Sequence, residues 1–188
     1  MKERRDAWPG QVAGVPAADW VFLDEFGSKT DMARARARAP RGVRAWSAVP
    51  HGHWKTLTTI AAPAAGGVVA AVTVDGGTTA DAFRTFLAES LVPALRPGQV
   101  VVMDNLSAHR SAGVEAAVAA AGCRVLYLPA YSPDLNPIEN AISKVKARLR
   151  AVAARTVDAL GHAVAEALAR VTPSDAAGFF RHCGYPAT

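Results

Sequence analysis

The chain has 188 residues, of which 51% are hydrophobic and 20% charged, so it is long enough to bury a substantial core as a globular protein. Its formal net charge of +5 permits binding to polyanions. No apolar run is long enough to cross a membrane, and the opening residues MKERRDAWPG lack the apolar centre of a secretory signal. We therefore expect a cytoplasmic protein with no membrane partner. Cys123 and Cys183 are too few for a disulfide framework, so we expect both to be reduced and structural.

The first half of the chain predicts a tether, three strands and a helix. The first 18 residues have no clear period and contain two prolines, which favours a tether. WVFLDEFG, at residues 20–27, is an apolar run ending in acids, as in a buried strand. Two β-rich segments, at residues 54–62 and 66–74, predict a hairpin with a wide loop. An amphipathic helix then begins at Thr78 or Thr79.

The second half alternates strands and helices. VVVMDNL, at residues 100–106, is an apolar strand ending in an acid, and CRVLYLP, at residues 123–129, is a further strand. Helical patterns cover residues 112–121, the segment after Asn136, and residues 157–171, and SDAAGFFRHCG closes the chain. Antiparallel strands followed by alternating strands and helices predict an α/β protein whose mixed five-stranded sheet is flanked by helices.

The segment YSPDLNPIENAISKVKAR predicts the start of a helix. Asn136 can cap it, Pro137 suits its first position, and Glu139 falls three residues after the cap, which is the spacing of a capping box. Its apolar stripe, which should face the core, consists of Ile138, Ile142, Val145 and Leu149. On local pattern alone, Glu139 is therefore a capping residue.

Two aspartates suggest a different role for Glu139. Asp24 and Asp104 each end an apolar run, and neighbouring strands would bring their carboxylates together. Such a pair is electrostatically unfavourable unless a cation lies between them, and oxygen ligands select Mg²⁺ or Mn²⁺. Glu139, on a helix packed across the strand ends, could supply a third carboxylate. Two ions held in this way can drive phosphoryl transfer. The alternative is that these acids cap loops.

Other titratable side chains favour structural roles. Glu25 should point to the opposite face of the strand from Asp24. Asp75 precedes two glycines and is typical of a turn, and Asp134 is expected to form an Asx turn. His51 and His53 lack the further ligands that zinc needs.

Basic residues form two groups that could follow a phosphate backbone. The first lies in RARARAPRGVR and consists of Arg34, Arg36, Arg38, Arg41 and Arg44. The second follows Glu139 and includes Lys144, Lys146 and Arg150. His109 is close enough to Asp104 in sequence to reach a phosphate, although a role in ordering its loop fits equally well. The arginine group could also be only a solvated face.

Three blocks together resemble a known family. VFLDEFG, VVMDNLSAHR and LPAYSPDLNPIENAISKVK are similar to the signature blocks of mariner-like transposases, closest to the bacterial insertion-sequence 630 group. The similarity runs from about Trp20 to Arg150. Residues 105–138, which are 34 in number, separate Asp104 from Glu139, as this resemblance leads one to expect. The resemblance implies a catalytic triad of Asp24, Asp104 and Glu139.

The resemblance implies an RNase H-like fold and a DNA-processing activity. We expect a tether at residues 1–18, a catalytic domain at residues 19–152, and a C-terminal helical extension at residues 153–188. The implied reaction is divalent-metal-dependent DNA cleavage and 3′-hydroxyl strand transfer during transposition, with two Mg²⁺ or Mn²⁺ ions in the site. The implied partners are double-stranded DNA, as element ends and target, and a second copy in a homodimer on paired ends. Family analogy also suggests insertion at a TA step.

The chain differs from the family pattern at two points. Ile142 stands where the family usually has tryptophan, which we interpret as a packing substitution. Family members normally begin with helix-turn-helix domains, and this chain starts almost at the catalytic core, so it resembles the second half of a transposase that arose from a split frame, a truncation or a remnant. A split frame would supply a separate N-terminal helix-turn-helix subunit. Two alternative functions stay open: a non-catalytic DNA-binding or assembly subunit, and an RNase H-like nuclease without joining activity.

Overall fold

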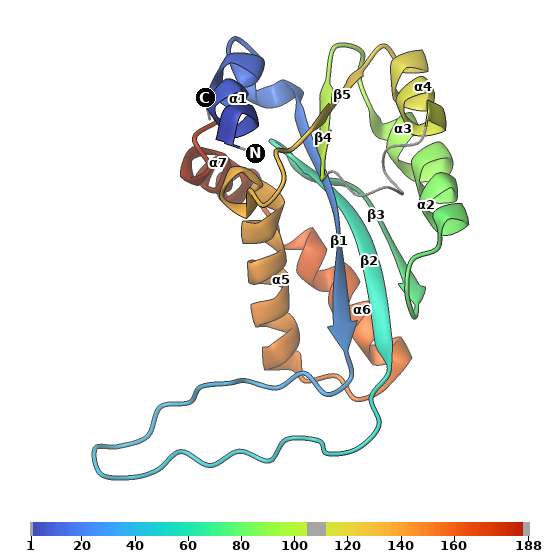
Figure 1. Cartoon of the computed structure of the whole chain (residues 1–188). Helices are drawn as coiled ribbons and strands as arrows, with labels where there is room; N and C mark the ends of the chain where they lie inside the picture. The colour runs from blue at the N-terminus through green and yellow to red at the C-terminus, as the bar shows by residue number, and fades with distance from the viewer. Residues whose placement is uncertain (1, 105–111, 186–188) are drawn as a thin grey trace.

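A five-stranded mixed sheet forms the centre of the protein (Figure 1). The computed structural model describes residues 2–104 and 112–185. The strands lie in the order β3-β2-β1-β4-β5, with the first three antiparallel and the pairs β1–β4 and β4–β5 parallel. Their bounds are β1 Trp20–Lys29, β2 Thr56–Ala64, β3 Gly67–Asp75, β4 Val100–Met103 and β5 Arg124–Tyr127. The predicted α/β architecture with five strands is confirmed.

Helices cover both faces of the sheet (Figure 1). One face carries α5 Pro137–Val152, α6 Val157–Ala169 and α7 Pro173–His182. The other carries α2 Ala80–Phe86, α3 Val92–Ala94 and α4 Ala112–Ala120, with a π-helical turn at Leu87–Leu91 between the first two. Helix α1, Lys2–Val12, lies at the upper end of the sheet, beside α7 and the C-terminus. Short 3₁₀ turns occur at Ala17–Asp19 and Pro133–Leu135.

The central strand β1 alternates between two hydrophobic cores. Trp20 and Phe22 belong to the core under α5, α6 and α7, whereas Val21 and Leu23 belong to the core under α2 and α4. This alternation follows from the two-residue period of a strand. Phe22 is fully buried and makes edge-on contacts with Phe180 and Tyr185, with ring centroids 5.4 and 5.0 Å apart. Residues of β1 with even numbers therefore face α5.

The N-terminal segment is a docked helix, although the sequence predicts a tether. In α1, the indole of Trp8 is only 3% exposed, and its N–H donates a hydrogen bond to the Tyr185 hydroxyl at 3.1 Å. One buried tryptophan and the charged side chains of KERRDAW leave too weak a helical period to recognise in the sequence. The contact that orders the segment lies at the opposite end of the chain.

The β2–β3 hairpin is tighter than the sequence predicts. Strand β2 continues through Pro63 to Ala64, and only Ala65 and Gly66 connect it to β3. The register shifts between Ala62 and Pro63, which is where a strand tolerates a proline. The prediction of a wide loop is therefore wrong. Of the residues PAAGG, Pro63 and Ala64 belong to β2, Gly67 belongs to β3, and only two residues form the turn.

Both cysteines are free and buried, as expected. Burial raises the pKa of the Cys183 thiol to about 11, so the side chain stays protonated at neutral pH. Among residues 2–104 and 112–185, no helix combines the length and apolarity that spanning a membrane requires.

Candidate active site

The register of β1 and β4 places Asp24 beside the end of β4. The last parallel pair joins Leu23 to Met103, so Asp24 and Asp104 are the next residues on their respective chains. The sequence predicts that Asp24 ends its strand. It does not, because β1 continues against β2 as far as Lys29. Its even number puts it on the α5 face with Phe22 and Phe26. Asp24 thus lies just beyond the point where β1 loses β4 as a neighbour.

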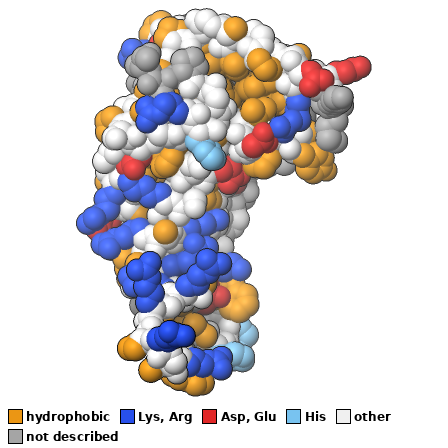
Figure 2. Space-filling model, turned by 90° about the vertical axis from the view of Figure 1, so that its left-hand side faces the viewer, with side chains coloured by type: hydrophobic (Ala, Val, Ile, Leu, Met, Phe, Trp, Pro, Cys, Tyr) orange, Lys and Arg blue, Asp and Glu red, His pale blue; other side chains and the backbone are white. Residues whose placement is uncertain are grey.

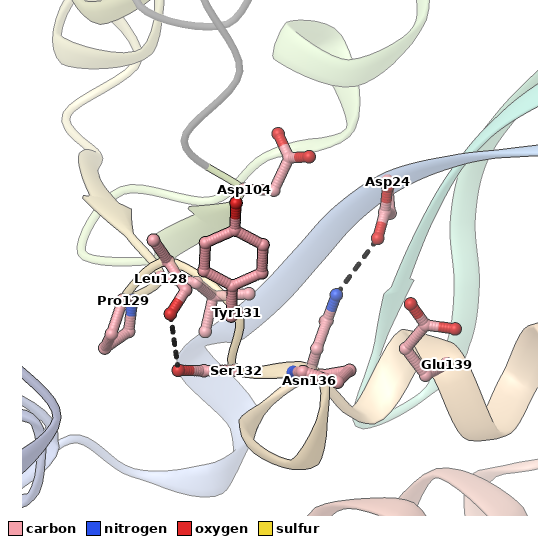
Figure 3. A pocket seen from close by; sticks show the side chains of 10 residues that line it. Asp24, Asp104, Leu128, Pro129, Tyr131, Ser132, Asn136 and Glu139 are labelled. Atoms are coloured by element: carbon pink, nitrogen blue, oxygen red, sulfur yellow. Dashed lines mark hydrogen bonds between the residues drawn. The ribbon is translucent and has the colours of Figure 1, made fainter. Parts of the chain in front are cut away.

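A cavity of about 450 Å³ lies at this point, and all three predicted acids line it (Figure 3). Asp24 comes from β1, Asp104 follows β4, and Glu139 comes from the first turn of α5. The remaining wall is the segment before α5, namely Leu128, Pro129, Ala130, Tyr131, Ser132, Pro133 and Asn136. Three carboxylates that are far apart in the sequence therefore share one cavity.

Helix α5 is anchored so that Glu139 faces outward. The predicted stripe of Ile138, Ile142, Val145 and Leu149 is buried. Glu139 lies on the adjoining row and is exposed. Pro137 occupies the first turn as expected. The burial of the stripe fixes which way Glu139 points.

The predicted capping box is wrong. Asn136 is the N-cap residue of α5, but its side chain makes no capping hydrogen bond. The Asn136 amide instead donates from Nδ2 to Asp24 Oδ2 at 3.0 Å (Figure 3). Glu139 contributes only its backbone N–H, which donates to the Asn136 carbonyl at 3.1 Å. The Asn136 side chain therefore binds Asp24, which is 112 positions away in the sequence, and does not cap α5.

The segment before α5 is braced by residues that sequence reasoning did not select. Arg5 of α1 donates to Ser132 Oγ at 2.8 Å and to both carboxylate oxygens of Asp134, at 2.9 and 2.6 Å. The Arg5 guanidinium holds the pKa of Asp134 below its usual value. Asp134 therefore has an ion-pair partner that the Asx-turn prediction does not include. No sequence signal links Arg5 to a segment more than 120 residues away.

A second brace comes from the C-terminus. The Tyr185 hydroxyl donates to the Leu135 carbonyl at 2.7 Å and accepts from Trp8. Tyr185 is 3% exposed, and burial raises the pKa of its phenol well above the usual range. The side chain is thus a neutral donor at neutral pH. Both chain ends hold the segment that leads into α5.

The donor chemistry of the cavity suits a hard divalent cation. Its walls offer carboxylate oxygens from Asp24, Asp104 and Glu139, which Mg²⁺ and Mn²⁺ prefer. Within the part of the chain that the structure describes, no three His, Cys, Asp or Glu side chains stand close enough together to hold an ion as they are. The residue types fit the ion, and the side chains need to converge to bind it.

The sequence profile of the DDE superfamily endonucleases matches residues 19–161, which contain all three acids. The chain belongs to this family. Among curated protein sequences, none is significantly similar to the chain.

Solved structures of the Mos1 transposase share the fold of this DDE superfamily endonuclease. The paired-end complex with the left transposon end superposes with a TM-score of 0.70 at 18% identity, over 96% of this chain and 55% of that chain. The mariner paired-end complex with Mn gives 0.71 at 19% identity, over 97% and 58%. The catalytic domain with Raltegravir and Mg gives 0.68 at 17% identity, over 96% and 87%. The expected RNase H-like fold is confirmed, and the chain spans little more than half of the full transposase.

Figure 2 shows the face of the molecule on which α5 lies, and many Lys and Arg side chains are exposed on it. Lys and Arg side chains gather over the lower part of this face. The five arginines predicted to contact DNA are exposed on a long loop between β1 and β2, which projects from the body (Figures 1 and 2). Asp31 is the sole acid in residues 31–55 of the sequence. The loop therefore presents a strong positive charge.

The basic residues of α5 differ in their surroundings. Lys146 is half-buried, with its ammonium 6.0 Å from the centre of the Phe26 ring, and Arg150 is exposed. Lys144 contacts Asp175 of α7, and this ammonium lowers the pKa of Asp175 to about 2. Lys144 thus already joins two helices, which leaves Lys146 and Arg150 as the better placed of the three for a phosphate. His109 lies outside the described residues.

Proposed function

We propose that this chain is the catalytic domain of a transposase of the insertion-sequence 630 group, which cleaves DNA strands and joins 3′-hydroxyl ends to target DNA. The observation that supports it most directly is the single cavity lined by Asp24, Asp104 and Glu139. An acidic cavity beside a basic face suits a phosphodiester substrate, because the basic side chains attract the phosphates and the acids can hold the cations that neutralise them. Residues 19–152 would be the catalytic domain and residues 153–188 its helical extension.

In this proposal, Asp24, Asp104 and Glu139 hold two Mg²⁺ or Mn²⁺ ions. When bound, such ions activate a water or a 3′-hydroxyl and stabilise the leaving oxygen. The protein's part is to orient the three carboxylates and the DNA. Lys146 and Arg150 continue the outward row of α5 beyond Glu139, so they would bind phosphates next to the scissile one. The DNA partners would be element ends and target DNA. The protein partners would be a second copy in a homodimer and a separate helix-turn-helix subunit. The protein would act in the cytoplasm.

The test uses the purified chain with two DNA substrates. Uncut inverted-repeat ends from beside the gene should be nicked in Mg²⁺ or Mn²⁺ and left intact in EDTA. Pre-cut ends bearing 3′-hydroxyls should be joined to a target plasmid, with TA steps preferred. Cleavage without joining would favour a nuclease, and salt-sensitive binding with neither reaction would favour a non-catalytic subunit. Either result would contradict the proposal.

The arginine loop should account for part of the salt dependence of DNA binding. Replacing Arg34, Arg36 and Arg38 by Ala should reduce the slope of log K against log salt by about 2 to 3, since each lost phosphate contact removes about 0.9. Fluorescence anisotropy with duplex DNA at several salt concentrations measures the slope. A double Ala variant of Arg84 and Arg124, which are exposed on α2 and β5, should leave it unchanged. Equal slopes in the triple variant and the wild type would mean that the loop does not contact phosphates.

A further inference from the structure

Asn136 is buried at the junction between the acidic cavity and α5. It is 4% exposed and lies in the wall of the cavity, three residues before Glu139. Asparagine is a good N-cap residue because its side-chain oxygen can accept a backbone N–H. The side chain of Asn136 makes no such bond and points to Asp24 instead (Figure 3). Its position at the start of α5 therefore does not explain what the side chain does.

The contacts of Asn136 link two of the three acids. Its Nδ2 donates to Asp24 Oδ2 at 3.0 Å, and its backbone carbonyl accepts the N–H of Glu139 at 3.1 Å. The other oxygen of Asp24, Oδ1, accepts the backbone N–H of Glu25 at 2.7 Å. With a donor on each oxygen, the Asp24 carboxylate is held in one orientation. Asn136 thereby sets the position of a strand carboxylate relative to a helix carboxylate.

The side-chain oxygen of Asn136 has no donor among the described residues that would explain its burial. Its Oδ1 is buried and receives no hydrogen bond from the residues that the structure describes. Buried amide oxygens are seldom left without a donor, so each case calls for an explanation. Because this oxygen is covered in the described structure, it can accept from water around a cation, or approach the cation itself, once the side chains of the cavity converge. Aspartate would cap the helix equally well, but its charge would repel Asp24.

We propose that Asn136 is a positioning residue of the cation site. It holds Asp24 through Nδ2, ties that carboxylate to the start of α5, and offers its buried Oδ1 to the surroundings of the cation. This inference rests on the proposed cation-dependent function. It adds a fourth side chain to the three acids that the family resemblance implies. Outer contacts of this kind typically change metal affinity 10-fold to 100-fold.

The test measures Mn²⁺ binding to the full chain by isothermal titration calorimetry, without DNA and without turnover. Asn136→Ala should raise the Mn²⁺ dissociation constant by about 10-fold. Asn136→Ser can still cap α5, but its shorter side chain does not reach Asp24, so it should show the same loss. Asn140→Ala is the matched control: it removes another α5 asparagine, whose Nδ2 lies 3.6 Å from Cys183 Sγ, and should bind Mn²⁺ as the wild type does.

The outcomes separate this inference from the proposed function. If the wild type binds Mn²⁺ and Asp24→Asn does not, the cation site stands. Wild-type affinity in Asn136→Ala or Asn136→Ser would then overturn the positioning role alone. If the wild type binds no Mn²⁺, both the cation site and the role of Asn136 are overturned. Circular dichroism identifies any unfolded Asn136→Ala protein, in which case Asn136→Ser decides.

Discussion

Asp24→Asn should abolish metal-dependent DNA cleavage, with a loss of about a thousandfold or more. The substitution keeps the shape of the side chain but removes the charge that the cation needs. A cation contributes several kcal/mol of transition-state stabilisation, and each 1.36 kcal/mol is tenfold in rate. Asp104→Asn and Glu139→Gln should fall to the same background, because in the proposed mechanism the three acids act as one unit.

The measurement is the rate of nicking of a labelled duplex under single-turnover conditions in Mg²⁺ and in Mn²⁺. Asp75→Asn is the matched control, since this exposed aspartate ends β3 and lies outside the cavity. It should cleave at the wild-type rate. Full cleavage by a folded Asp24, Asp104 or Glu139 variant would remove that residue from the proposed catalytic triad.

Trp8→Ala should lower the free energy of unfolding by about 3 kcal/mol or more. Truncating a buried tryptophan removes a large apolar surface and leaves a cavity, which typically costs 3–5 kcal/mol. The variant also leaves Tyr185 without the indole donor that it has at 3.1 Å. Because Tyr185 braces Leu135, the effect should extend from α1 to the segment before α5.

Urea denaturation followed by circular dichroism measures this loss. Trp46→Ala is the control, because Trp46 is 81% exposed on the loop between β1 and β2. Its expected change is within about 0.5 kcal/mol. A Trp8→Ala protein with the wild-type denaturation midpoint would mean that the burial of Trp8 contributes nothing to the stability of the domain.

The parts of the fold that follow from local pattern are predictable from the sequence. The buried stripe of α5 and the five strands arise from hydrophobic periodicity, which each segment carries by itself. The cap of α2 is equally local, since the Thr79 hydroxyl accepts the Ala82 N–H at 3.1 Å. The cavity shared by Asp24, Asp104 and Glu139 is also anticipated, because the resemblance relates three blocks that local pattern cannot connect.

The contacts that the sequence does not predict are those between distant segments. Asn136 looks like a cap because capping is a local geometry, and only the folded sheet brings Asp24 within reach. The helix α1 looks like a tether because its single buried tryptophan finds its partner 177 positions away. In both cases, a tertiary contact replaces the structure that local propensity favours.

The bond between Trp8 and Tyr185 has a consequence for synthesis of the protein. A ribosome releases the N-terminal part of a chain first, and domains generally fold as units. The separation of 177 positions means that α1 has no Tyr185 partner until the segment that contains Tyr185 has also been synthesised. The Leu135 carbonyl likewise cannot accept its hydrogen bond until Tyr185 has been synthesised. A nascent chain can thus form much of the sheet while the wall of the acidic cavity still lacks its final brace.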